Sequence, residues 1–168
     1  MDVLWSPWRS KYIETFKDED KNKGIGCFLC DAVLSAEKEH TCLVVAKRPE
    51  CFAILNKFPY NNGHLLIAPL RHIAELDDLG EHELMAMMKL VREGMQVIRE
   101  AYKPHGFNVG INIGRVAGAG VPGHIHIHIV PRWNGDTSYM ATLADVKIVS
   151  TALEETQKQF ADIFDRMK

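Results

Sequence analysis

The most regular alternation of polar and apolar residues in this 168-residue chain runs from residue 123 to residue 131. Histidine and isoleucine take turns over this stretch, and a period of two residues is typical of a β-strand, whose successive side chains point to opposite faces. The pattern predicts a strand with three imidazoles on one face and three isoleucines, the core side, on the other. The alternating residues are His124, Ile125, His126, Ile127, His128 and Ile129.

Four shorter apolar runs also predict strands, because turn residues bound each of them. Three of the runs follow one another closely, which suits an antiparallel meander. The predicted strands are residues 41–46, 51–56, 64–68 and 107–113. The last strand leads into residues 114–123, where four of ten residues are glycine. The backbone amides of such a loop can approach a phosphate group closely.

Apolar residues recur at intervals of three and four over residues 80–103 and again over residues 150–167, which predicts two amphipathic helices. With the strands, they predict an α+β fold: an antiparallel sheet with one long helix packed on it and a C-terminal helix. The residues predicted to face the core are Leu84, Met88, Val91, Met95, Ile98 and Tyr102 in the first helix, and Leu153, Phe160, Ile163 and Met167 in the second.

Length and composition indicate one soluble domain with a small partner. Hydrophobic residues make up 46% of the chain and charged residues 25%, and the net charge is −2. This balance gives no basic surface for nucleic acid or for an anionic membrane. No apolar run reaches the ~20 residues of a membrane span, and the N-terminus does not resemble a signal peptide. We therefore expect a cytoplasmic protein that binds a small molecule and neither nucleic acid nor a membrane.

Three histidines on one strand face allow two kinds of chemistry besides a purely structural role. Histidines at positions i and i+2 can bind a catalytic zinc or iron ion, which would make His124, His126 and His128 a metal site. Alternatively, one neutral imidazole attacks an electrophile while its neighbours orient it and bind the anion of the substrate.

The segment Cys27-Phe28-Leu29-Cys30 contains a second candidate site. A Cys-x-x-Cys pair is either a redox pair, which belongs at the start of a helix in a βαβ unit, or half of a zinc site. The sequence predicts no such helix here, so we favour structural zinc, with His72 and His124 as the best candidates for the other two ligands. Two buried thiols without a metal are the simpler alternative. Cys42 and Cys51 lie in apolar runs and are predicted to be inert core residues.

The run Gly-His-Ile-His-Ile-His-Ile-Val-Pro-Arg, residues 123–132, resembles the His-x-His-x-His-x-x motif of the histidine triad (HIT) family. The likeness continues in Gly63-His64-Leu-Leu-Ile-Ala-Pro. Near the N-terminus, Trp-Ser-Pro-Trp-Arg resembles the diadenosine polyphosphate phosphorylase-like branch of bacteria and archaea, as does the turn after the triad. The resemblance implies a single HIT domain over residues 1–168, with a core at 25–136 between an N-terminal extension at 1–24 and a C-terminal one at 137–168.

The resemblance also implies an activity. HIT proteins cleave dinucleoside polyphosphates or related adenylated compounds, and here His126 would form the covalent nucleoside-monophosphate intermediate. A nucleoside phosphoramidase, or a zinc-stabilised nucleotide-binding protein with little turnover, is the alternative. Whether water or inorganic phosphate attacks the intermediate, which separates a hydrolase from a phosphorylase, is left open. The resemblance further implies a homodimer.

The family pattern assigns a role to particular positions of this chain. The loop departs from the pattern at residues 119–121, where Ala, Gly and Val replace the glutamine or serine of many members, so that backbone amides are left to contact the phosphates. The implied residues are His126, His128 and His124 for catalysis; Asn56, His64, Asn112, Gly118, Gly120 and Val121 for nucleotide binding; and Cys27, Cys30, His72 and His124 for structural zinc.

Overall fold

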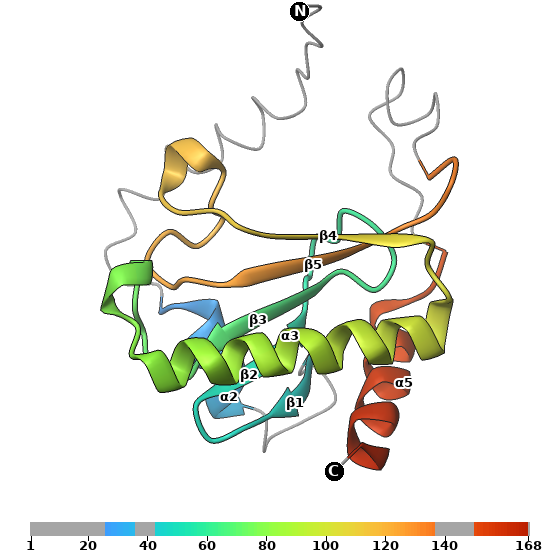
Figure 1. The fold of residues 1–168 in the computed structure, drawn as a ribbon, viewed down its shortest axis with the longest axis horizontal. Helices are drawn as coiled ribbons and strands as arrows, with labels where there is room; N and C mark the ends of the chain where they lie inside the picture. Colours follow the sequence, from blue (N-terminus) through green and yellow to red (C-terminus); the bar gives the residue numbers. More distant parts are fainter. Residues whose placement is uncertain (1–25, 36–42, 137–149, 168) are drawn as a thin grey trace, which may run out of the picture.

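The structure is a computed structural model that describes residues 26–35, 43–136 and 150–167. Its five strands form one antiparallel sheet in the order β1-β2-β3-β5-β4, as predicted for an α+β fold (Figure 1). The strands are β1 (Val44–Lys47), β2 (Cys51–Leu55), β3 (Leu65–Pro69), β4 (Gly106–Ile111) and β5 (Ile127–Arg132). The helices are α2 (Phe28–Ser35), α3 (Glu81–Tyr102) and α5 (Leu153–Arg166), with single 3-10 turns at Leu76–Asp78 and Arg115–Ala117.

The two faces of the sheet have different partners. Helix α3 covers one face and approaches it most closely at Gly94, where an added Cβ would lie 2.9 Å from Leu65 and 3.2 Å from Ile129. The opposite face carries His128, which is paired in register with Leu66 on β3 and Gly110 on β4. Helix α2 closes part of that face through a second apolar cluster of Leu29, Phe52, Ile54, Leu66 and Ala68. Among the described residues, the histidine face is therefore left uncovered beside β5 and β4.

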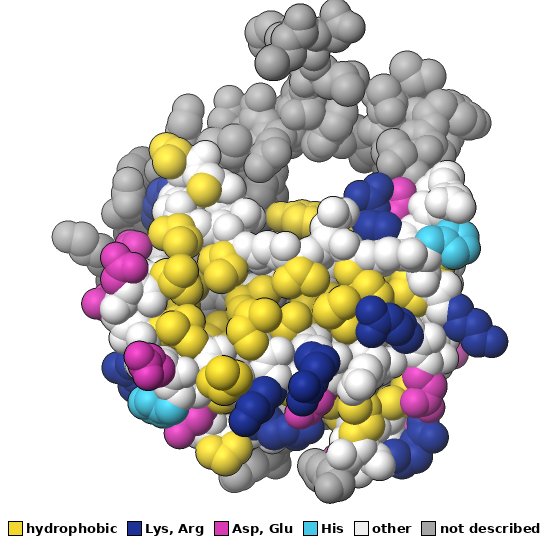
Figure 2. All heavy atoms as spheres, viewed as in Figure 1, with side chains coloured by type: hydrophobic (Ala, Val, Ile, Leu, Met, Phe, Trp, Pro, Cys, Tyr) yellow, Lys and Arg dark blue, Asp and Glu magenta, His cyan; other side chains and the backbone are white. Residues whose placement is uncertain are grey.

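Both ends of helix α3 lie within two residues of the predicted ones. The side of the helix that is buried, however, is rotated about the helix axis from the side that the apolar residues predicted. Val91 and Ile98 are buried as predicted, whereas Met88 is 55% exposed, so its assignment to the core was wrong. The buried face is centred on Gly94, because only glycine allows the helix axis to come this close to β3 and β5. Met88 thus remains on the exposed side of α3, and Figure 2 shows a hydrophobic strip between α3 and β4.

Helix α5 packs against β1 and the end of α3. Phe160 and Ile163 are buried as predicted, and so is Phe164, which the predicted stripe missed. Gln157 donates a hydrogen bond to the Val44 carbonyl (3.1 Å), which ties the helix to β1. Met167 lies just past the helix end and is 38% exposed, which contradicts its predicted burial.

Two local elements differ from the predictions. Strand β5 begins at Ile127, four residues later than predicted, because Ile125 hydrogen-bonds to Ile73 outside the ladder (2.6 Å) and the sheet pairing starts only after it. Helix α2, which was not predicted, begins directly after Cys27. Cys51 is buried as predicted; Cys42 and the N-terminal aromatic segment lie outside the described residues. Within the described ranges, no helix is long and apolar enough to span a membrane.

Candidate functional site

The hydrogen bonds of His126 determine which of its two ring nitrogens is free. Its Nδ1 lies 2.8 Å from the His124 carbonyl oxygen. A carbonyl can only accept, so Nδ1 carries the hydrogen and Nε2 keeps its lone pair. Nε2 has no hydrogen-bond partner among the described residues. Burial lowers the pKa of His126 below its ordinary value, against the opposing effect of this hydrogen bond, and so favours the neutral ring. His126 therefore presents an unprotonated nitrogen.

His128 has the opposite arrangement, which follows from its contact with His64. The Tyr60 amide donates to Nδ1 of His64 (3.0 Å), so the ring hydrogen of His64 is on Nε2. That Nε2–H lies 3.0 Å from Nδ1 of His128, which must therefore accept. The hydrogen of His128 is then on Nε2, a buried atom with no partner in the described part of the chain. His128 is a hydrogen-bond donor poised 4.8 Å, ring centre to ring centre, from His126.

The side chain of Asn56 also orients the His64 ring. Its side-chain oxygen accepts from the Phe58 amide (2.9 Å), and its Nδ2 donates to Nδ1 of His64 (3.2 Å). Two donors thus converge on one nitrogen of His64 and fix its tautomer. The turn after β2 supplies both of them, and it begins where the apolar run of that strand stops.

Burial keeps these rings uncharged. Burial, together with the smaller effects of the neighbouring imidazoles of His128 and His126, lowers the pKa of His64 to about 3. Burial likewise lowers the pKa of His128 to about 4, assisted by His126. At neutral pH both rings are neutral, so the direction of the chain of hydrogen bonds from Tyr60 to His128 does not change with small changes in pH.

The glycine-rich loop lies beside the histidines. It follows β4, whose last residue, Ile111, pairs with Ile127, so the next residue, Asn112, lies next to His126. Asn112 Nδ2 donates to the Gly118 carbonyl (3.4 Å), and the Gly118 amide donates to Arg115 (2.9 Å). The Gly118 amide is thus occupied within the loop. The amides of Gly120 and Val121 have no hydrogen bond to any described residue. These two amides are the loop donors that a phosphate could take.

The predicted metal ligands meet in space although they come from three separate segments. Ligand atoms of Cys27, Cys30, His72 and His124 lie within 4.8 Å of one another. Nδ1 of His124 is 3.3 Å from Cys27 Sγ and 3.5 Å from Cys30 Sγ, and His72 Nδ1 is 3.4 Å from Cys30 Sγ. Around a tetrahedral zinc ion, bond lengths of ~2.3 Å to sulfur and ~2.0–2.1 Å to nitrogen place such atoms ~3.5 Å apart. The spacing fits.

The tautomer of His124 also fits a metal. Its Nε2 lies 2.9 Å from the Pro69 carbonyl oxygen, which can only accept, so Nδ1 keeps its lone pair and faces the two thiols. A backbone carbonyl that orients a ligating histidine in this way is the usual outer partner at zinc sites. His126 and His128 belong to no metal-binding group within the described ranges, so three triad histidines around one metal ion are not supported.

The side chains that the sequence singled out lie close together in the structure, but the backbone groups that orient them were not predicted. The backbone groups of Tyr60 and Pro69, which select the tautomers, carry no signal in residue type. The helix that starts after Cys27 was missed because residues 28–35 have only a weak apolar periodicity. Although helix starts are where redox Cys-x-x-Cys pairs lie, two histidines beside the thiols favour metal binding over disulfide chemistry.

The antiparallel sheet of this α+β fold thus holds a free imidazole nitrogen of His126, the imidazole donor of His128 and two loop amides without partners among the described residues. The chain belongs to the HIT family, because the HIT domain model matches residues 37–135. The AP-4-A phosphorylase of Mycobacterium tuberculosis is 35% identical over 159 residues, which cover 94% of this chain and 82% of that protein. The asymmetrical bis(5'-nucleosyl)-tetraphosphatase of Schizosaccharomyces pombe is 34% identical over 67% of this chain and 58% of its own length.

Solved structures agree with this assignment. A Zn-bound histidine triad family protein from Mycobacterium smegmatis has a TM-score of 0.67 and 26% identity, over 84% of this chain and 95% of its own. A histidine triad nucleotide-binding protein from Sulfolobus tokodaii also has a TM-score of 0.67, with 28% identity over 84% and 94% of the two chains. This chain is therefore similar in sequence to an AP-4-A phosphorylase and to a bis(5'-nucleosyl)-tetraphosphatase, and in fold to a zinc-bound relative.

Proposed function

We propose that the protein cleaves dinucleoside polyphosphates, or related adenylated compounds, through a covalent nucleoside monophosphate on Nε2 of His126. The observation that carries the proposal is the hydrogen bond from Nδ1 of His126 to the His124 carbonyl, which leaves Nε2 unprotonated. The similarity to a phosphorylase and to a tetraphosphatase of dinucleoside tetraphosphates supports the substrate class. An imidazole of this kind needs no deprotonating partner, only orientation.

In the first step, Nε2 of His126 attacks the α-phosphorus of the bound nucleotide. A P–N bond forms, the P–O bond to the rest of the substrate breaks, and the departing oxygen leaves as an anion that accepts a hydrogen bond from Nε2–H of His128. The amides of Gly120 and Val121 and the Asn112 amide stabilise the charge that develops on the phosphoryl oxygens.

In the second step, an acceptor attacks the same phosphorus from the side that the leaving group vacated. Water gives a nucleoside monophosphate, and inorganic phosphate gives a nucleoside diphosphate; the P–N bond breaks in both cases. The electron pair of the P–N bond returns to Nε2 of His126, and the proton that an attacking water loses passes to the product phosphate or to solvent, while His128 keeps its Nε2–H. His64 acts as a positioning residue, since it keeps Nδ1 of His128 in the accepting state.

We further propose that Cys27, Cys30, His72 and His124 hold structural zinc. A closed set of two thiols and two imidazoles suits zinc that has no open coordination position. Such an ion would join α2, the segment after β3 and the triad segment, and thereby fix the backbone on which His126 stands. It would take no part in the reaction itself.

Two copies of the chain are proposed to pair through the edge of the sheet. Strand β4 is the last strand in the order, so one row of its backbone groups faces away from the sheet. The hydrophobic strip in Figure 2 lies beside it, with Val109 at 44% exposure on β4 and Met88 at 55% on α3. A second copy would cover both features.

The activity is tested by incubating the protein with diadenosine triphosphate and tetraphosphate, with and without inorganic phosphate, and separating the products. The proposal predicts cleavage by the wild type and loss of turnover in His126→Gly, with unchanged folding and metal content. Adenosine diphosphate that appears only with inorganic phosphate identifies a phosphorylase. Turnover that survives in His126→Gly would refute the mechanism, and tight nucleotide binding without cleavage would favour a binding protein.

A further inference from the structure

A groove of about 380 Å³ runs along the open face of the sheet from the reaction centre toward the end of β5. Its lining comes from the turn before β3 and from neighbouring positions of β4 and β5, among them Tyr60, Asn108, Gly110, His128 and Arg132. Pockets for small molecules have about 300–1,000 Å³. The groove is thus large enough for a ring system. The roles assigned above to His128 and Asn112, which both line it, account only for its near end.

The groove is placed to receive what departs from His126. His128, the proposed donor to the leaving group, lines its near end, whereas His126 does not line it. Val130, which also lines the groove, lies four residues beyond His126 on the same face, which at ~3.3 Å per residue is ~13 Å along the chain from the nucleophile. A ligand that reaches both places has a short extended chain followed by a larger group.

The charges of the groove favour a neutral ligand at its far end. Arg132 is the one guanidinium or ammonium group lining it in the described structure, and Asp136 takes two of its donors at 2.6 and 2.8 Å. Asn108 accepts a third at 2.7 Å. The Arg132 guanidinium holds the pKa of Asp136 well below its usual range, so the pair stays ionised and carries no net charge. A polyphosphate would find little attraction there.

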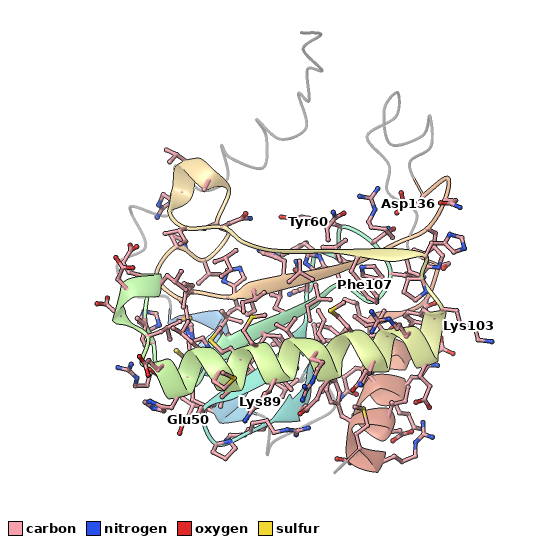
Figure 3. The ribbon with its side chains drawn as sticks, in the orientation of Figure 1. Glu50, Tyr60, Lys89, Lys103, Phe107 and Asp136 are labelled. Atoms are coloured by element: carbon pink, nitrogen blue, oxygen red, sulfur yellow. The ribbon has the colours of Figure 1, made fainter. Side chains whose placement is uncertain are left out.

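Tyr60 and the glycine of β4 provide surfaces for a flat ring. The Tyr60 ring is 47% exposed and stacks on the His128 ring at 15°. Gly110 is paired with His128 across the sheet, and an added Cβ there would have no atom within 4 Å, so the floor of the groove is open. In Figure 3, Tyr60 and Asp136 lie near β4 and β5, away from α3. Exposed aromatic rings beside amides are the usual means of holding a nucleobase.

We propose that this groove binds the second nucleoside of a dinucleoside polyphosphate, the half that leaves when His126 takes the first. The inference rests on the proposed function and adds a binding site to it. The base lies against Tyr60 over Gly110, Asn108 contacts polar groups of the base or ribose, and the phosphate chain runs back past His128.

The test narrows the groove without touching the histidines. Gly110→Val adds a side chain over the groove floor, and valine suits a strand. Gly106→Val is the matched control, because Gly106 is on the same strand and face, is equally open, and does not line the groove. Each variant is checked by thermal unfolding. The value of kcat/KM is then measured for diadenosine tetraphosphate and for adenosine 5′-phosphofluoridate, whose fluoride leaving group has no nucleoside.

We expect Gly110→Val to lower kcat/KM for the tetraphosphate about tenfold, the loss of one base contact, and to change the fluoridate value little. Gly106→Val changes neither. Equal loss with both substrates, or no loss with the tetraphosphate, would overturn the groove assignment while leaving the His126 chemistry intact. A wild type that cleaves neither substrate would instead contradict the proposed function.

Discussion

Two histidines two positions apart have opposite tautomers in this protein. Nε2 of His124 donates to the Pro69 carbonyl and leaves Nδ1 free, whereas Nδ1 of His126 donates to the His124 carbonyl and leaves Nε2 free. The first free nitrogen faces the thiols of Cys27 and Cys30, and the second is left for chemistry. One alternating motif therefore serves a metal cluster and a nucleophile at once, and carbonyl oxygens decide which residue does which.

The buried neutral rings of His64 and His128 make stability depend on pH. Their pKa values of about 3 and about 4 lie below the ordinary value near 6.5, so between about pH 6.5 and pH 4 the unfolded chain binds more protons than the folded one. The free energy of unfolding should then fall with decreasing pH, by up to about 1.4 kcal/mol per pH unit for each ring. Urea unfolding at about pH 7.5 and about pH 5 measures this slope.

His64→Gln removes the titration of His64 and should make that slope shallower. His82→Gln is the control, because His82 is exposed and should leave the slope unchanged. A slope that is the same in the wild type and in His64→Gln would show that His64 is not buried in its neutral form.

The turn before β3 places His64 through a glycine that no other residue can replace without strain. Gly63 has a positive φ of 72°, and an added Cβ would lie 3.0 Å from the Tyr102 ring and 3.1 Å from Phe160. Gly63→Ala should cost the backbone strain of ~1–2 kcal/mol and, in addition, an overpacking cost of ~1–3 kcal/mol. It should also lower activity, since His64 is the next residue. Chemical denaturation and the rate of dinucleotide cleavage measure the two effects.

Gly135→Ala separates the two causes. Gly135 has nearly the same φ, 76°, but nothing lies within 4 Å of an added Cβ. This variant should show the backbone cost alone and keep its activity. Equal destabilisation in both variants would mean that the side chains of Tyr102 and Phe160 move aside for the added methyl group, so that there is no overpacking cost.

The metal cluster joins α2 to the segment after β3 and to the triad segment, so the ion should stabilise the histidine side of the sheet. Removing the metal with a chelator should lower the melting temperature, because the energy of binding a structural metal contributes to folding. Cys30→Ser should reduce bound zinc, measured by elemental analysis, and remove the chelator effect. Cys51→Ala, which changes a buried thiol outside the cluster, should retain both. If the chelator leaves the melting temperature of the wild type unchanged, the proposal of structural zinc is contradicted.

The elements could be predicted from the sequence more reliably than their ends and faces. The alternation of residues 123–131 located the triad but not the start of β5, because the hydrogen bond of Ile125 to Ile73 comes from a segment fifty residues away. The predicted buried side of α3 differs from the observed one because the helix lies closest to the sheet at Gly94, and not at a large apolar residue. Tertiary contacts determine both the start of β5 and the buried side of α3, and the local pattern of apolar residues cannot predict such contacts.

The same limit applies to the site. Residue types and spacing placed Cys27, Cys30, His72 and His124 together, since few donor sets suit zinc. They could not show that Tyr60 and Arg132 line a groove beside His128, because that requires the strand order and the neutral pairing of Arg132 with Asp136.

The assembled molecule is expected to be a dimer in which β4 and α3 meet their counterparts. Val109→Lys places a charge on the exposed side of β4 and should shift the protein to monomers, measured by light scattering after size-exclusion chromatography. Leu34→Lys is the control, because Leu34 is 78% exposed on α2, away from this edge. A wild-type protein that is monomeric at micromolar concentration would refute the pairing.

The covalent intermediate tests the mechanism most directly. Wild-type protein is mixed with diadenosine tetraphosphate and denatured within the first turnovers at alkaline pH, where a P–N bond persists. The masses of the intact chain and of its proteolytic peptides are then measured by mass spectrometry. The account predicts a mass increase of one adenylyl group, located on His126 and absent from His126→Asn. Product formation with no such adduct, or an adduct on His124 or His128, would contradict it.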